Sequence, residues 1–230
     1  MLRLFVRTLT LTAALMSTNL GFARSAVAHP HVRISVEATF VVERGAVTAI
    51  KHRWTFDEDY RRSSFLDFDV DKNGILDASE LAAFQELSLE TLRSFDSFTV
   101  VWRDGVKVKL QEPVLVRFDL QAAKPIYEFE VALSTPVPLT GAGASIEVYD
   151  PTYYSAFDFN SDRALSIEVA DGTSCSTTPG PPARQSQQMK DYRAYVAAFG
   201  PLSARLVMPR SIKLTCQNVE VSPGKANVDQ

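Results

Sequence analysis

The sequence has few of the residues that perform nucleophilic or redox chemistry: three histidines and two cysteines among 230 residues. A serine or cysteine nucleophile is activated by a histidine base, and His52 is the only histidine beyond the N-terminal region. Because His52 lies between Lys51 and Arg53 on an expected strand, we interpret it as an exposed polar residue. The sequence also lacks a glycine-rich phosphate loop and a His-Glu-x-x-His pattern. We therefore expect a protein that is not an enzyme.

Excess positive charge and long hydrophobic runs are also missing. The chain has 24 lysines and arginines against 27 acidic residues, a formal net charge of −3. No basic stripe with interleaved aromatic residues is present, which argues against nucleic acid as a partner. The N-terminal apolar run, Leu9–Met16, is interrupted by threonines and is too short for a membrane-spanning helix.

The first residues instead have the pattern of a secretory signal. Arg3 and Arg7 precede the apolar run, and Ala26–Ala28 supplies small residues for cleavage. We expect residues 1–28 to be removed, with a cut after Ala23 as the alternative, so that no stable membrane anchor remains. Removal of 1–28 takes away three arginines and no acidic residue, which lowers the net charge from −3 to −6.

The strongest motif is the twelve-residue stretch from Asp69 to Glu80, which matches an EF-hand calcium loop. Calcium prefers six to eight oxygen ligands, and the motif places oxygens at positions 1, 3, 5, 7, 9 and 12 of the loop. A glycine, Gly74, occupies position 6, where the backbone turns sharply. The expected Ca²⁺ ligands are Asp69, Asp71, Asn73, the carbonyl of Ile75, Asp77 through a water, and both oxygens of Glu80.

The residues on both sides of the loop favour the same interpretation. Residues 57–68 can form an entering helix, and Leu81, Phe84, Leu92 and Phe95 recur near helical spacing on an exiting helix. Leu76, at position 8, is expected to pack inward. The alternative is a solvated acidic turn between two helices, without a metal.

The rest of the chain reads mainly as strands. A hairpin is expected from Val32 to Phe56 around Gly45, and Pro136 to Gly143 is expected to form a loop. The fold class is therefore α+β, mainly β: an antiparallel sandwich or barrel-like domain over residues 29–217, with the helix pair inserted at about 57–96. Further strands are expected at Phe98–Trp102, Val106–Leu110, Val114–Leu120, Ile126–Leu133, Ile146–Tyr149 and Ala164–Val169.

Towards the C-terminus, residues 171–188 are rich in Gly, Pro, Ser, Thr and Gln and are expected to form a mobile loop. A helix over 187–199, a strand over 212–216 and a disordered tail over 218–230 are expected to follow. Two cysteines in an exported chain most simply form one disulfide, and a functional thiol pair is the alternative. The expected bridge joins Cys175 to Cys216.

The presumed mature N-terminus suggests a second metal site. Cleavage after Ala28 would make His29 the first residue, and its amine and imidazole, with His31, could hold Zn²⁺, Ni²⁺ or Co²⁺. Asp150, before Pro151 and among three tyrosines, is a candidate oxygen ligand beside the histidines. The alternatives are exposed histidines on a frayed end and a turn whose tyrosines pack over a sheet edge.

Four segments occur in an order that resembles the DUF1007 family of exported bacterial proteins. They are Ala28–Val32, Trp54–Asp57, Asp69–Glu80 and Val148–Tyr154, and the resemblance spans roughly residues 28–217. Members are described as periplasmic components of transition-metal transport systems. The resemblance implies a periplasmic accessory that binds or hands over a divalent metal, with an inner-membrane metal transporter as its partner.

Two other classes of function are alternatives. The first is a non-catalytic envelope adhesion or interaction module, in which calcium stiffens the fold and Tyr149–Tyr154 forms the contact face. The second is a hydrolase that uses Asp57 or Asp150.

Overall fold

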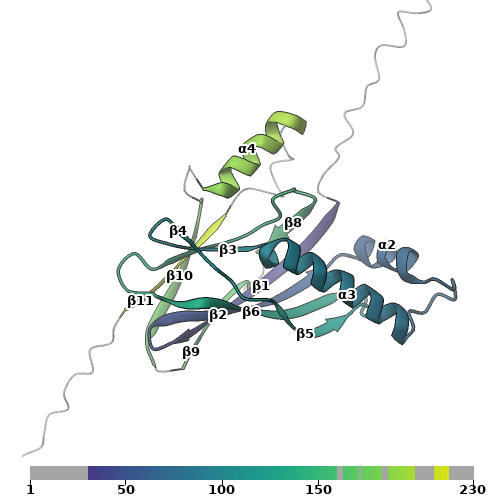
Figure 1. Ribbon diagram of the computed structural model, residues 1–230, viewed down its shortest axis with the longest axis horizontal. Helices are drawn as coiled ribbons and strands as arrows, with labels where there is room; N and C mark the ends of the chain where they lie inside the picture. Colours follow the sequence, from purple (N-terminus) through teal and green to yellow (C-terminus); the bar gives the residue numbers. More distant parts are fainter. Residues whose placement is uncertain (1–30, 160–162, 171, 183–185, 200–209, 218–230) are drawn as a thin grey trace, which may run out of the picture.

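A computed structural model describes residues 31–159, 163–170, 172–182, 186–199 and 210–217 (Figure 1). Within these ranges the chain forms two β-sheets, a helix pair between β2 and β3, and a helix between β10 and β11. The elements are β1 (Val32–Glu43), β2 (Ala46–Phe56), α2 (Glu58–Phe68), α3 (Ala78–Ser94), η1 (Asp96–Phe98), β3 (Thr99–Arg103), β4 (Val106–Val108), β5 (Val114–Asp119), β6 (Ile126–Pro138), β7 (Ala144–Val148), β8 (Ser155–Asp158), β9 (Leu165–Val169), β10 (Ser174–Gly180), α4 (Gln187–Phe199) and β11 (Ser211–Gln217).

The larger sheet is built around three long strands. Its order is β5-β6-β2-β1-β8, with β9 also paired to β1. The hairpin between β1 and β2 turns at Arg44 and Gly45, whose φ angles of 51° and 71° are those of a tight hairpin turn. β1 pairs in antiparallel fashion with β2 but in parallel with β8 and β9. The expected antiparallel sheet therefore carries parallel strands at one edge.

The smaller sheet has the order β10-β11-β7-β3-β4. The predicted β3–β4 hairpin is confirmed, and its turn residues Asp104 and Gly105 have φ angles of 49° and 79°. The expected mobile loop over 171–188 is wrong for 174–180, which form β10 and pair with β11 along their length. The serine and threonine residues of this segment suggested a loop, but backbone pairing and one covalent link hold it in place as a strand. That link is the predicted disulfide between Cys175 and Cys216, which lie directly opposite each other.

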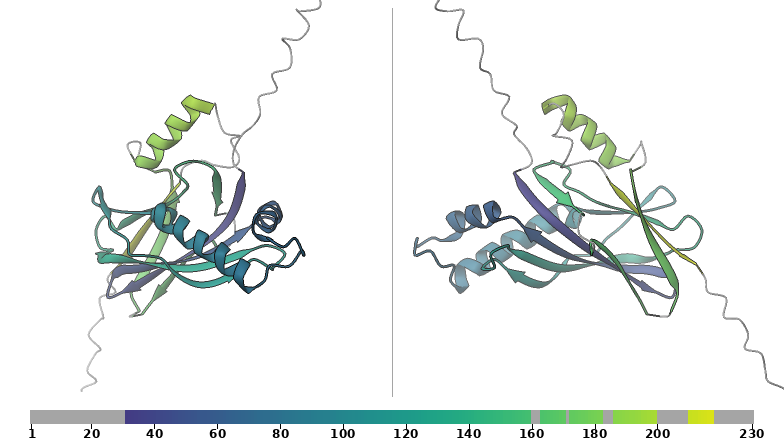
Figure 2. Two further views of the ribbon diagram at one scale, coloured as in Figure 1. Left: turned by 45° about the vertical axis from the view of Figure 1, so that its right-hand side comes forward. Right: turned by 180° about the vertical axis from the view of Figure 1, so that it is seen from behind.

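The inner face of the large sheet is covered by two different structures. Over one half, Phe40 and Val131 pack against Ile146 and Leu214 of the small sheet. Over the other half, Trp54 and Phe56 of β2 form a second core with Leu76 of the α2–α3 loop and with Phe84 and Leu92 of α3. Figures 1 and 2 show α3 lying along the large sheet, with the α2–α3 loop at one end of the molecule. The fold class is confirmed: mainly β, with a helix pair and one C-terminal helix.

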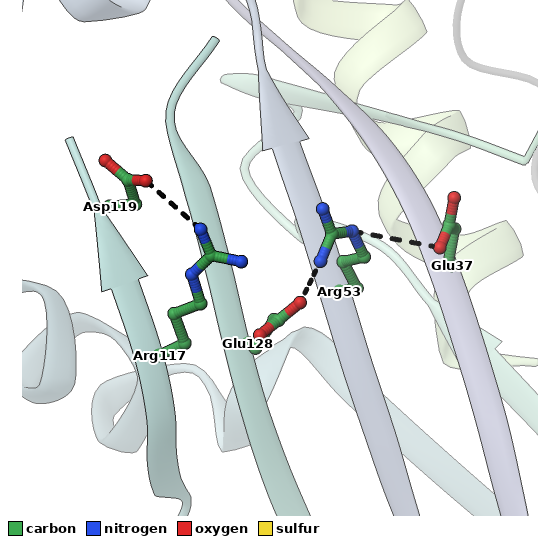
Figure 3. Close-up of polar contacts among 5 residues, drawn as sticks. All are labelled: Glu37, Arg53, Arg117, Asp119 and Glu128. Atoms are coloured by element: carbon green, nitrogen blue, oxygen red, sulfur yellow. Dashed lines mark hydrogen bonds and ion pairs between the residues drawn. The ribbon is translucent and has the colours of Figure 1, made fainter. Parts of the chain in front are cut away.

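The opposite face of the large sheet is charged (Figure 3). Arg53 on β2 pairs with Glu37 on β1 and Glu128 on β6, and Arg117 pairs with Asp119 on β5. Opposite charges on neighbouring strands attract, but exposed pairs of this kind contribute only about 0–1 kcal/mol each. This face is therefore a solvated surface, and the stability of the sheet comes from its inner face.

The described residues also test the expected loop at Pro136 to Gly143 and the expected C-terminal helix. The loop expected at Pro136 to Gly143 begins later, because β6 continues through Pro138 next to the N-terminal end of β2. The predicted C-terminal helix is confirmed as α4. None of the helices in the described residues is both long and apolar enough to cross a membrane.

Candidate calcium site between two helices

The helices on both sides of the predicted loop are started by aspartates. The side chain of Asp57 accepts a hydrogen bond from the backbone N–H of Tyr60, 2.8 Å away, at the start of α2. Asp77 caps α3, accepting from the backbone N–H groups of Ser79 and Glu80. The Glu80 side chain accepts from the N–H of Asp77 in return, which completes a capping box. Both helix ends are therefore fixed by local sequence.

The loop backbone has the shape that the motif requires. Gly74 has a φ of 81°, a conformation in which a side chain would be strained, and Lys72 also has a positive φ of 59°. Ile75 is exposed, so that this position contributes only its backbone. Leu76 is 2% exposed and belongs to the core beneath the helices. Leu76 therefore anchors the loop to the domain.

Backbone N–H groups orient the side chains of the first half of the loop. The two carboxylate oxygens of Asp69 accept from the N–H groups of Asn73 and Gly74, at 3.0 and 2.8 Å. Asp71 accepts from the backbone N–H of Asn73 at 3.1 Å, and the side-chain amide oxygen of Asn73 accepts from the N–H of Ile75 at 2.7 Å. Each oxygen keeps a lone pair after one such bond. These bonds therefore hold the oxygens in place and leave them able to bind a cation.

Glu80 joins the two ends of the loop. Its side chain is buried, and its two oxygens accept from the N–H groups of Val70 and Asp77, at 2.7 and 3.0 Å. The carboxylate thus lies across the loop in the first turn of α3, where the helix dipole favours negative charge. The hydrogen bonds to Asp77 from Glu80 and Ser79 lower the pKa of the Asp77 carboxyl. Asp77 is therefore ionised at neutral pH and serves first as a helix cap.

Three of the predicted ligands converge. Ligand oxygens of Asp69, Asp71 and Glu80 all lie within 4.8 Å of one another, the one group of three metal-ligating side chains within the described ranges. Oxygens bound to one calcium ion at about 2.3–2.6 Å lie at most about 5 Å apart. Three carboxylates this close repel one another, and a divalent cation would relieve that repulsion. The donor set of carboxylate, amide and carbonyl oxygens also fits a hard cation such as calcium.

The predicted histidine site is only partly within the described residues. His29 lies outside them, whereas the N–H of His31 donates to the carbonyl of Tyr154 at 2.9 Å, and the two rings lie 5.0 Å apart. Asp150 is buried, and its carboxylate accepts from Thr152 and from the N–H of Ser155. These bonds give Asp150 a role in closing its turn. Its role as a metal ligand stays a prediction.

The expected exposure of His52 is wrong. The ring is 2% exposed and stacks on Phe129 with ring centres 4.8 Å apart, and Nε2 lies 3.2 Å from the hydroxyl of Thr99. Burial lowers the pKa of His52 to about 3, so the ring is neutral at physiological pH. Its charged neighbours Lys51 and Arg53 point to the opposite face of β2, since side chains alternate along a strand.

The sequence reading also missed a buried carboxyl group, Glu147. Glu147 lies on β7 between the inward-facing residues Ile146 and Val148, a position that alternation predicts to be exposed. It is instead 2% exposed, and the hydroxyl of Tyr149, two residues further along the chain, donates a hydrogen bond to Asp191 of α4 at 3.0 Å. Burial raises the pKa of Glu147 to about 7, and the negative charge of Asp191 acts in the same direction. No local sequence signal indicates that Glu147 is buried.

Comparison with known proteins identifies relatives but not an activity. An uncharacterized protein of Haemophilus influenzae is 28% identical over 148 residues, which cover 62% of this chain and 68% of that protein. No solved structure matches the chain. The model of the family described as "Protein of unknown function (DUF1007)" matches residues 14–205. Because that match covers most of the sequence, the chain belongs to the DUF1007 family.

Proposed function

We propose that this protein binds one calcium ion through the loop Asp69–Glu80 and uses the ion to stabilise the helix pair that covers half of the large sheet. The observation that supports this most directly is the convergence of three carboxylates within 4.8 Å in a loop with a glycine at its turning point. The ligands would be those expected from the motif: Asp69, Asp71, Asn73, Ile75, Asp77 and Glu80. The ion would supply positive charge to a cluster of acidic groups, without a chemical reaction.

The expected effect is modest. Isolated extracellular sites of this type bind calcium with a Kd of roughly 10⁻⁴–10⁻³ M. At about 10 mM calcium, binding to the native state alone would then add about 1.4–2.7 kcal/mol to the free energy of unfolding. For a domain of this size, that corresponds to a rise in Tm of about 3–10 °C.

The test compares two glutamate-to-glutamine variants on the same helix. Glu80→Gln keeps a residue that can complete the capping box but removes the carboxylate that closes the site. Glu90→Gln, at an exposed position of α3, is the matched control. Thermal melts with EGTA and with 10 mM calcium should show the shift in wild type and Glu90→Gln and its loss in Glu80→Gln. Equal shifts in Tm in all three proteins, or no shift in wild type, would contradict the proposed calcium site.

We further propose that the protein acts in the periplasm as an accessory to an inner-membrane transporter of Zn²⁺, Ni²⁺ or Co²⁺. The disulfide fits an oxidising compartment, and the hydrogen bond from His31 to Tyr154 brings the start of β1 next to the turn that contains Asp150. Zinc titration of a chain that begins at His29 should give tighter binding than titration of the same chain with an added N-terminal methionine. Equal affinities would exclude the N-terminal amine as a ligand.

The alternative of an envelope interaction module receives less support. In its expected contact face, Tyr149–Tyr154, two of the three tyrosines are buried: Tyr149 and Tyr153, the latter against Tyr195 of α4. Tyr154 is the one tyrosine of the three with a large exposed area.

A further inference from the structure

A cavity of about 320 Å³ lies between α3 and the inner face of the large sheet. Its floor consists mainly of aromatic rings, Trp54, Phe56, Phe98 and Phe157, which belong to the core beneath the helices. At its rim, three large apolar side chains are exposed to solvent: Leu87, Phe95 and Tyr154. Exposed apolar groups around an apolar hollow are typical of a binding site.

The volume limits the size of the ligand. A dry apolar cavity of about 150 Å³ is large enough to hold a benzene molecule. The cavity beneath α3 is about 320 Å³ and is open to solvent at its rim. It therefore suits an apolar body of about two fused rings, and it is at the small end of the range for ligand sites.

Three of the hydroxyl groups that line the cavity form one hydrogen-bonded chain. Tyr60, Tyr127 and Ser88 all line the cavity, with oxygens 2.9 Å apart for Tyr60–Tyr127 and 3.1 Å apart for Ser88–Tyr127. Ser88 also donates to the carbonyl of Phe84 at 2.8 Å. A carbonyl can only accept, so the three bonds form together in one order: Tyr60 donates to Tyr127, which donates to Ser88, which donates to Phe84.

This order determines which hydrogen-bonding group a ligand of the cavity must carry. Each hydroxyl has one hydrogen, and all three are used within the chain, whereas the oxygens keep lone pairs that can accept. Burial raises the pKa of both Tyr60 and Tyr127, so neither phenol ionises at neutral pH. This chain therefore accepts hydrogen bonds from a ligand, and a ligand that bonds to it carries a donor.

The charges of the lining argue against a charged ligand. Among the described residues that line the cavity there is no lysine, arginine or histidine to balance an anion. Asp150 is the acidic residue of the lining, and its carboxylate already accepts from Thr152 and Ser155. We propose that the cavity binds a neutral alcohol or phenol, with an apolar body of about two rings and a hydroxyl that donates to the Tyr60–Tyr127–Ser88 chain.

Matched probes test the ligand chemistry without changing the protein. Calorimetric titration of the purified chain would use 2-naphthol, 2-methoxynaphthalene, which has the same rings but no donor, and 2-naphthoate, an anion. We expect saturable one-to-one binding of 2-naphthol, and binding about 5–10-fold weaker for the methyl ether, the effect of one lost hydrogen bond. The anion should bind more weakly than 2-naphthol. Equal affinity for all three, or no saturable binding of 2-naphthol, would overturn the proposal.

Two variants locate the site. Leu87→Trp should fill the mouth of the cavity and weaken 2-naphthol at least 10-fold, whereas Leu66→Trp, an exposed position of α2 outside the lining, should leave binding unchanged. Tyr127→Phe should weaken 2-naphthol but leave the methyl ether unaffected. Each variant is measured with EGTA and with calcium, which separates the cavity from the calcium site. If 2-naphthol does not bind and sedimentation shows a dimer that Leu87→Trp disrupts, the cavity is an interface between copies of the chain and the proposal is wrong.

Discussion

Replacement of Glu147 by glutamine should stabilise the protein at neutral and alkaline pH. Glu147 is 2% exposed, and one of its oxygens has no hydrogen-bond partner. Asp191, on α4, adds a second negative charge nearby, and the phenols of Tyr149 and Tyr153 keep their protons because burial raises the pKa of both. A glutamine has a similar shape but never carries a charge, so the variant removes the cost of ionising this buried group.

The size of the effect follows from the pKa. Burial raises the pKa of Glu147 from 4.5 to about 7 in the folded protein. Because the folded state holds the proton more tightly, the contribution of Glu147 to stability is complete below about pH 4.5 and is lost as the pH rises to about 7. At 1.36 kcal/mol for each unit of pKa, the loss is about 3 kcal/mol.

Thermal or urea unfolding between pH 5 and pH 8.5 would measure this difference. At pH 5 the glutamine variant should be nearly as stable as wild type, and above pH 7.5 it should be more stable by about 2–3 kcal/mol, or about 6–10 °C in Tm. Glu90→Gln, at an exposed position, should show no such trend. If the difference in unfolding free energy between Glu147→Gln and wild type stays constant across this range, the raised pKa of Glu147 is refuted.

Three further changes test the loop and the disulfide. Leu76→Ala should cost about 2–5 kcal/mol because Leu76 is buried, whereas Ile75→Ala, an exposed neighbour, should cost less than about 0.5 kcal/mol in unfolding experiments. Gly74→Ala should weaken calcium binding in titrations and destabilise the protein by about 1 kcal/mol or more, because φ is 81° there. The Cys175→Ser/Cys216→Ser double variant should lower the urea-unfolding free energy by about 3–4 kcal/mol, since the bridge closes a loop of 41 residues.

The geometry of the loop Asp69–Glu80 was predictable because all of its determinants are local. The oxygens, the glycine and the inward leucine occur at fixed spacings in one short segment, and the structure places them accordingly. The helix caps are equally local: Asp57 and Asp77 each bond to an N–H group two or three residues later. The hairpins at Gly45 and Gly105 were predictable for the same reason.

The features that the sequence could not reveal depend on which distant segment covers each face. His52 is buried because the inner face of β2 is covered along its whole length, whereas its charged neighbours on the strand suggested exposure. Glu147 is buried although strand alternation predicts exposure, and Asp191 of α4, about 40 residues later, is close enough for its charge to raise the pKa of Glu147. β10 looked like a loop by composition, and its pairing with β11 and the bridge at Cys175 made it a strand.

The relative size of two energies indicates what calcium can do for this fold. Burial of a side chain such as Phe84 or Leu92, both on α3, stabilises a protein by about 1.5–3 kcal/mol, and several such residues join the helix pair to Trp54 and its neighbours. Calcium at about 10 mM would add about 1.4–2.7 kcal/mol in all. The ion is thus worth about as much as one buried side chain. Packing already holds α3 against the sheet, so calcium would tighten the loop around Glu80 and would not be needed for folding. A far-UV spectrum that loses its helical signal in EGTA at 25 °C would contradict this reasoning.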